Sequence, residues 1–384
     1  MKTRVALFCL IVASITAIRL QGQNYIYATG NPTFSTQIPI ENGFIDLNNG
    51  EIHMAIPLAT HTQRGRIPLN ESLVYDSRIW QISSSGGYSW QPTNVPGSMA
   101  GWRLVSNNTA QAPTFNSAYT EYGSCGPGQQ QYPTQEFFWN FVWVDAQGTS
   151  HSFATTLTQQ LPLNPCQENV QNENATGSAL DGSGYSISVT YDPNSQGLDF
   201  VVYDVDFNQV YPIVQDTNGN YYSSDSNGNL IDTLGRTPVM TTINGNQITY
   251  KVLGWNGTYY SYIVTTGTVY YNTNFNQTLQ GYHIHDTSGS FTAIQSIQLP
   301  DLSSYQFTYD SGTSSGHYGE LTSVTLPTGG VIQYSWLTYT DAFQNRNRWV
   351  STRLKDSGDL PPFSQPLITG VSRVWVRGEY SPPS

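Results

Sequence analysis

Apolar and polar residues alternate along most of the chain, and an alternation of period two predicts β-strands whose successive side chains point to opposite faces. Such segments place Tyr, Phe, Ile or Val on one face and Ser, Thr, Gln or Asp on the other, as is typical of half-buried antiparallel strands. Helical periodicity is almost absent after residue 22, so we expect an all-β protein. The clearest alternating segments are 185–191, 198–202, 248–252, 260–264 and 305–309.

Turn residues support a meandering, antiparallel sheet built from hairpins. Asn-Gly dipeptides tolerate the positive φ that tight hairpins require. One segment breaks the alternation, because residues 137–144 are apolar or aromatic on both faces apart from Asn140. We expect a central strand there that is covered on both sides. The Asn-Gly pairs lie at 42–43, 49–50, 218–219, 227–228, 244–245 and 256–257.

An internal repeat indicates stacked β units. Residues 294–309 align with residues 321–336 at a constant offset of 27, and apolar character is kept at every core position. A shorter repeat aligns 216–220 with 225–229 at an offset of nine. Repeated units of this kind predict a stacked or spiralling sheet. In the longer repeat, Phe307 corresponds to Tyr334, and both should face inward. Gln306 corresponds to Gln333, and both should face outward.

The N-terminus predicts export. Lys2 and Arg4 precede an apolar run over 5–17, and small residues follow, which is the layout of a signal peptide over 1–22. A retained membrane anchor is the alternative, but spanning a bilayer takes roughly 20 apolar residues and this run is shorter. We therefore expect a protein that is secreted, at the cell surface or in the periplasm, without membrane insertion of the mature chain.

Four regions follow the signal peptide. Residues 107–184 are rich in Asn, Gln, Gly, Ser and Pro, so we expect long surface loops around the aromatic strand 137–144. The final stretch is rich in proline and should form a loose tail. The expected regions are 23–106, an N-terminal β region; 107–184, a loop-rich region; 185–350, a repeat-bearing β-sheet; and 351–384, the C-terminal tail.

Cys125 and Cys166 are the two cysteines left after the signal peptide. In an oxidising compartment they should form a disulfide, and closing a loop of about 40 residues stabilises a fold by roughly 3–4 kcal/mol. Two independent thiols are the alternative.

Composition and charge exclude one class of partner. Charged residues make up 11% of the chain, against roughly 25% in an average soluble domain. The formal net charge is −11 and the chain has only 15 Lys and Arg. Nucleic-acid binding needs clustered positive charge, so we expect no nucleic-acid partner.

Motifs of catalysis and of metal or cofactor binding are not apparent. His283 and His285 would share a strand face, but a metal site needs a third ligand and none is identifiable. The acidic loops at 216–220 and 225–229 lack the spacing of an EF-hand, and hairpin turns already account for them. No nucleophile elbow, zinc-protease helix or phosphate-binding glycine loop occurs. We expect no cofactor, no metal and no enzymatic activity, although paired carboxylates of a glycosidase would meet only in the fold.

Several segments together resemble exported Rhs/YD-repeat proteins. Residues 43–53, followed by Ile56-Pro57-Leu58 and by 72–77, resemble the opening of these proteins. Residues 299–310, 319–330 and 225–236 resemble their repeat-bearing portion. The resemblance implies a β-sheet that spirals into a shell, which in this family often encloses a toxic C-terminal segment or carries adhesive ends. The dense tandem repeats and the self-cleavage residues of the family are missing here, which implies a short or truncated member.

These observations favour a non-catalytic, exported structural or surface-presentation protein with a protein or glycan partner at the cell surface. The alternative is a secreted carbohydrate-binding β module that uses exposed aromatic side chains. Its candidate residues for stacking on sugar rings are Trp80, Trp90, Trp102 and Trp255. Packing in the core is the competing interpretation of each tryptophan.

Overall fold

The computed structural model describes residues 28–33, 35–62, 64–65, 67–84, 87–93, 99–106, 111–161, 173–192, 195, 197–224, 229–279, 281–356 and 363–366. Every regular element within these residues is a β-strand, which confirms the all-β class. None of the described residues forms a helix long and apolar enough to cross a membrane. The predicted signal peptide lies outside the described residues.

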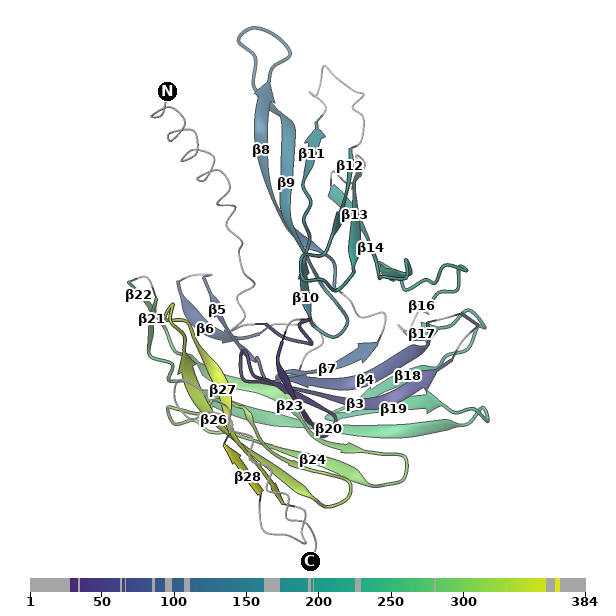
Figure 1. The fold of residues 1–384 in the computed structure, drawn as a ribbon, viewed down its shortest axis with the longest axis vertical. Coiled ribbons are helices and arrows are strands. Elements are labelled where there is room, and N and C mark those ends of the chain that lie inside the picture. Colours follow the sequence, from purple (N-terminus) through teal and green to yellow (C-terminus); the bar gives the residue numbers. More distant parts are fainter. Residues whose placement is uncertain are drawn as a thin grey trace, which may run out of the picture.

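The chain forms a two-layer β sandwich from which an arm of further strands projects (Figure 1). The smaller layer is an antiparallel sheet of five strands in the order β1-β2-β3-β4-β7. These strands are β1 (Gln37–Ile40), β2 (Gly43–Asp46), β3 (Glu51–His61), β4 (Leu69–Asp76) and β7 (Trp102–Ser106).

The larger layer has nine strands that follow one another in chain order, apart from one excursion, β21 (Gln277–Leu279) and β22 (Tyr282–Ile284). All pairings are antiparallel, which confirms the predicted meander. The strands are β18 (Val239–Asn244), β19 (Gln247–Leu253), β20 (Tyr259–Asn272), β23 (Ser288–Gln298), β24 (Ser304–Tyr309), β25 (Leu321–Thr325), β26 (Val331–Thr340), β27 (Arg346–Asp356) and β28 (Phe363–Pro366). β27 and β28 therefore extend into the region expected to be a loose tail.

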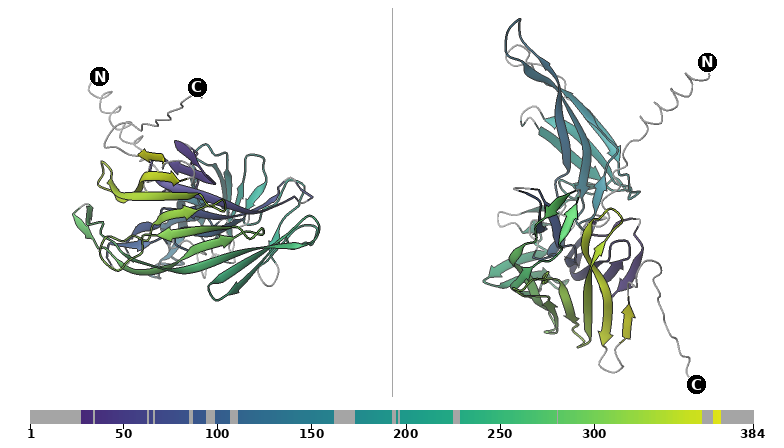
Figure 2. Two further views of the ribbon diagram at one scale, coloured as in Figure 1. Left: turned by 90° about the horizontal axis from the view of Figure 1, so that it is seen from below. Right: turned by 90° about the vertical axis from the view of Figure 1, so that its left-hand side faces the viewer.

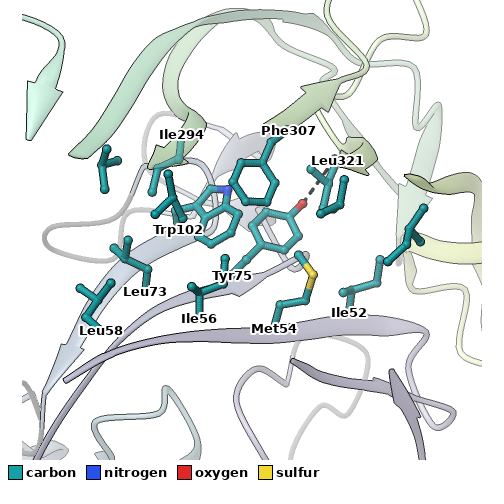
Figure 3. Close-up of a cluster of buried hydrophobic side chains, with 14 of the residues drawn as sticks. Ile52, Met54, Ile56, Leu58, Leu73, Tyr75, Trp102, Ile294, Phe307 and Leu321 are labelled. Atoms are coloured by element: carbon teal, nitrogen blue, oxygen red, sulfur yellow. Dashed lines mark hydrogen bonds between the residues drawn. The ribbon is translucent and has the colours of Figure 1, made fainter. Parts of the chain in front are cut away.

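The main core lies between the two layers. Figure 3 shows Met54 and Tyr75 from the smaller layer facing Phe307 and Leu321 from the larger one. Burying each such side chain stabilises the fold by roughly 1.5–3 kcal/mol. One polar pair lies within this core, since Nε1 of Trp102 donates a hydrogen bond to the hydroxyl of Tyr309 at 2.9 Å.

The two copies of the longer repeat adopt equivalent structures. Phe307 and Tyr334 are 2% and 5% exposed, and Gln306 and Gln333 face solvent. This confirms the predicted inward and outward positions.

Hydrogen bonds in the two copies also correspond. The hydroxyl of Tyr309 donates to the carbonyl of Ile294, and Nε1 of Trp336 donates to the carbonyl of Leu321, at the same sequence separation of 15. Each copy also has a shift in strand register next to this aromatic residue. The sequence offset of 27 therefore reflects a structural repeat.

The arm consists of two packed sheets, and the right-hand view of Figure 2 shows it projecting from the sandwich. Its first sheet contains β8 (Thr114–Gly123), β9 (Tyr132–Val144), β10 (Ser150–Ser152) and β11 (Leu157–Gln160). Its second contains β12 (Asn174–Ser178), β13 (Ser186–Asp192), β14 (Gly197–Tyr203) and β15 (Gln209–Tyr211). Phe138, Phe141 and Trp143 pack against Val189 and Val202 between them.

The arm corrects two sequence predictions. Residues 107–184 are not mainly loops, because all four strands of the first arm sheet and β12 lie within them. The expected boundary at 185 divides a sheet, since β12 pairs with β13 across it.

A backbone irregularity explains why 137–144 is apolar on both faces. Asn140 has a φ of 58° and is exposed, and β9 has one more residue than β8 at this point. An extra residue reverses which face the following side chains occupy. Phe138 is buried before this bulge and Phe141 and Trp143 after it, all in one core. The prediction of a strand covered on both sides was therefore wrong.

Five hairpin turns in the described part of the chain share one pattern that starts with aspartate. In each, the fourth residue has a positive φ and donates its N–H to the aspartate carbonyl. The fifth residue donates its N–H to the aspartate carboxylate. The side chain thereby satisfies a backbone donor that a short turn would leave unpaired. The turns begin at Asp145, Asp204, Asp216, Asp232 and Asp341.

A separate hairpin, β5-β6, covers one end of the sandwich. β5 (Trp80–Ser83) pairs with β6 (Ser89–Pro92), and a small core joins them to the excursion β21-β22. A short pair, β16 (Ser223–Ser224) and β17 (Leu230–Ile231), precedes the large sheet.

Candidate functional site

Three of the four tryptophans that were candidates for stacking on sugar rings are core residues, as the competing interpretation of core packing predicts. Trp80, Trp90 and Trp102 are at most 1% exposed. Nε1 of Trp80 donates to the carbonyl of Tyr318 at 3.0 Å, and the ring of Trp90 stacks on Phe275 with centroids 3.8 Å apart. Flanking Asn and Gln residues suggested exposure, but large aromatic rings are the most effective fillers of a small core.

Trp255 is the member of this set that reaches solvent, with 98% of its surface exposed. It lies in the turn between β19 and β20, where the backbone of Gly254 pairs with Thr258. A single exposed ring on a turn offers a sugar one stacking surface and no enclosing pocket.

The structure does not bring the other candidate residues from the sequence together in one site. His283 and His285 are exposed neighbours with ring centroids 5.3 Å apart. Among the described residues no group of three or more His, Cys, Asp and Glu is placed to hold a metal ion. Asp216 uses its carboxylate to hold its own turn, and the loop at 225–228 lies outside the described residues. Cys166 also lies outside them, so the disulfide with Cys125 stays a prediction.

Buried carboxyl groups do gather in the sandwich, but they are enclosed. Glu51, Asp76 and Glu320 are at most 2% exposed. Burial alone would raise the pKa of Asp76, but the ion pairs with Arg103 and His53 hold it at about 2. Burial and the charge of Asp76 raise the pKa of Glu51 well above its ordinary value, so Glu51 is neutral beside a charged neighbour. These carboxyl groups are enclosed in the interior of the sandwich, so they cannot contact a substrate.

An accessible site lies where the base of the arm meets the sandwich. A pocket of about 250 Å³ opens there between β4 and β7 on one side and β9 and the second arm sheet on the other. Figure 1 shows the base of the arm beside these strands. The lining residues are Ile67, Asn70, Ser72, Val105, Trp143, Asp145, Ala146, Gln147, Tyr185, Asp204, Val210 and Val214.

Aromatic rings form one wall of this junction pocket. The rings of Trp143 and Tyr185 meet edge to face with centroids 5.0 Å apart. Nε1 of Trp143 is buried and has no hydrogen-bond acceptor among the described residues. Burial and the charges of Asp145 and Asp204 raise the pKa of Tyr185 to about 12, so its hydroxyl keeps its proton and remains a donor.

Two aspartate turns supply the carboxylates of the pocket. Oδ1 of Asp145 accepts the N–H of Thr149 at 2.8 Å. Oδ1 of Asp204 accepts the N–H groups of Asp206 and Asn208, and its Oδ2 accepts the amide of Asn208. The turns therefore fix both carboxylates in position before any ligand is present.

A histidine behind the pocket balances part of this negative charge. Nδ1 of His151 lies 2.6 Å from Oδ2 of Asp181, and Nε2 lies 3.4 Å from Oδ2 of Asp145. Burial alone lowers the pKa of His151, but the two aspartates outweigh burial and raise it. The ring also stacks on Trp143 with centroids 5.6 Å apart. The histidine thereby links the aromatic wall to the acidic side of the pocket.

Sequence reasoning missed every residue of this site. Its lining comes from 67–72, from Val105, from 143–147, and from 185–214, which are far apart along the chain. The repeated Asp-x-x-Gly pattern at Asp145 was the one local signal, and it indicates a turn rather than a pocket.

No protein-family model matches this chain, and no curated protein matches its sequence.

Proposed function

We propose that this chain is a non-catalytic, exported surface-presentation protein, in which a rigid β sandwich holds an arm for contact with a partner. The proposal extends the resemblance of the sequence to the shell-forming portion of Rhs/YD-repeat proteins. In this role the chain acts as a structural scaffold of that kind.

The exposed edge of the arm is the observation that carries this proposal. β8 pairs only with β9 among the described strands, and nine of its ten residues are exposed. Tyr119 and Tyr122 are each more than half exposed, with ring centroids 6.4 Å apart. Tyrosine is enriched at the energetic centres of interfaces, and an edge strand offers free backbone groups to an added strand.

The rigid support of the arm favours presentation over a loose tether. The turn after β9 is bound to the N-terminal segment, because the hydroxyl of Thr29 donates to the carbonyl of Gly148 at 2.7 Å. Arg103 of β7 also donates to the carbonyl of Gln147. These contacts join the base of the arm to the sandwich.

Binding of the purified protein to the surface of cells that export it would test this role. We compare the wild type with the double variant Tyr119→Ser/Tyr122→Ser, and use Tyr270→Ser as a control, because Tyr270 is 50% exposed on β20 of the sandwich. Loss of two interface tyrosines should weaken saturable binding by about tenfold or more. The control should bind like the wild type, and circular dichroism should be unchanged in both variants.

Equal binding by the double variant and the wild type would contradict the assignment to β8. Absence of the wild type from the cell surface would contradict presentation itself.

A further inference from the structure

We infer that the junction pocket binds a neutral sugar ring, a function that does not depend on the contacts of β8. The pocket combines an aromatic wall, apolar side chains and fixed carboxylates, and a sugar presents matching surfaces. Its C–H faces are apolar and its hydroxyl groups both donate and accept hydrogen bonds. Ligand sites generally have this mixture of an apolar lining and a few fixed polar groups.

The apolar side of the pocket suits the face of a ring. Ile67, Tyr185 and Val210 line it with partly exposed side chains, and behind them lie Val105, Val214 and Trp143, which are at most 2% exposed. Aromatic rings gain from contact with the weakly positive C–H groups of a sugar because the ring face is electron-rich. This wall belongs partly to the sandwich and partly to the arm, so a bound ring would contact both.

The polar side suits hydroxyl groups. A carboxylate has roughly four lone-pair sites. The described hydrogen bonds use two of them in Asp145 and three in Asp204. The remaining sites can accept hydroxyl protons, and Tyr185 can donate to a hydroxyl oxygen.

Charge selects against ionic ligands. No Lys, Arg or His is among the lining residues, so an anionic sugar would meet two carboxylates and no cationic side chain on the pocket wall. A cation would be attracted less strongly than by two unpaired carboxylates, because His151 lies against Asp145 and the pKa of His151 is raised. A neutral ring avoids both conflicts.

Titration of sugars, followed by tryptophan fluorescence and calorimetry, tests this inference on the full mature chain. The panel contains neutral hexoses, N-acetylhexosamines and their α- and β-methyl glycosides, with glucuronic acid and glucosamine as charged comparators. We expect saturable binding of at least one neutral sugar with a Kd on the order of 1 mM, as for a ligand of about a dozen heavy atoms. A methyl glycoside that binds as well as its free sugar would identify the terminal residue of a glycan as the source, and a methyl glycoside that fails would identify the free sugar.

Two pocket variants and one control separate the site from other surfaces. Ala146→Trp fills the pocket at a middle position of a turn whose hydrogen bonds come from Asp145, so the fold is retained. Asp204→Asn removes a charge but keeps an oxygen that can accept the turn N–H groups. Both should weaken binding by about tenfold or more, as expected when a fixed polar contact is lost. Trp255→Ala should leave the Kd unchanged.

Three results would overturn the inference. They are the absence of saturable binding across the neutral panel, tighter binding of either charged comparator, and binding that survives Ala146→Trp but is lost in Trp255→Ala.

Discussion

Glu71 makes the stability of the sandwich depend on pH in a direction that can be measured. It lies on β4, is 4% exposed, and its Oε2 has no hydrogen-bond partner in the described part of the chain. Burial raises the pKa of Glu71 from 4.5 to about 7. Below pH 4.5 the carboxyl is neutral in both the folded and the unfolded chain, and no penalty arises.

The penalty appears as the pH rises. Between pH 4.5 and about 7 the unfolded chain releases the proton of Glu71 while the folded chain retains it, so the folded state loses stability. At 1.36 kcal/mol per pKa unit, this loss amounts to about 3 kcal/mol and is complete above pH 7. Glu71→Gln has no such proton, so the variant should gain about 3 kcal/mol relative to the wild type between pH 4 and pH 8.

Urea denaturation of both proteins at intervals between pH 4 and pH 8 would measure this difference. Other titrating groups cancel, because they are present in both chains. Glu121→Gln is the matched control, since it makes the same chemical change at an exposed position on β8. The reasoning would be refuted if the difference in unfolding free energy between Glu71→Gln and the wild type changed by less than about 0.5 kcal/mol from pH 4 to pH 8.

Three further predictions concern the repeat, a buried ion pair and the two cysteines. In the repeat, alanine at either inward aromatic residue should cost roughly 3–5 kcal/mol, and alanine at either outward glutamine should stay within about 0.5 kcal/mol, as measured by denaturation. These positions are Phe307 and Tyr334, and Gln306 and Gln333. Arg103→Met should destabilise by roughly 3–5 kcal/mol because it leaves Asp76 charged and buried, and an unchanged midpoint of denaturation would count against that ion pair. Non-reducing peptide mapping should recover a peptide that joins Cys125 and Cys166, whereas two free thiols would exclude the bond.

The sandwich was predictable where the sequence alternates. The nine-stranded sheet follows segments such as 248–252 and 305–309 because one face of each strand lies against the core and the other faces solvent. The turns after Asn244 and Asn256 were predictable for a local reason, since Gly245 and Gly257 both have positive φ. The repeat was predictable because equivalent core positions keep apolar residues.

The arm was harder to predict because its strands lack that contrast. β8 is exposed on both faces, so no alternation marks it. In β9 the bulge at Asn140 shifts the alternation of buried and exposed residues by one position. Apolar residues then occur at both odd and even positions, so a strand with one buried face has the sequence of a fully buried strand. The junction pocket depends on how segments separated by more than a hundred residues meet, and no local pattern encodes that.

The aspartate-based turns also determine where this protein can change during evolution. In these hairpins the carboxylate of the first residue and the left-handed fourth residue fix the backbone, so the turn places little demand on the two residues between them. Leu234 and Phe343 occupy such middle positions and are largely exposed. These sites should therefore accept substitutions freely, including a short peptide tag or a new epitope, while the strands on either side keep their register.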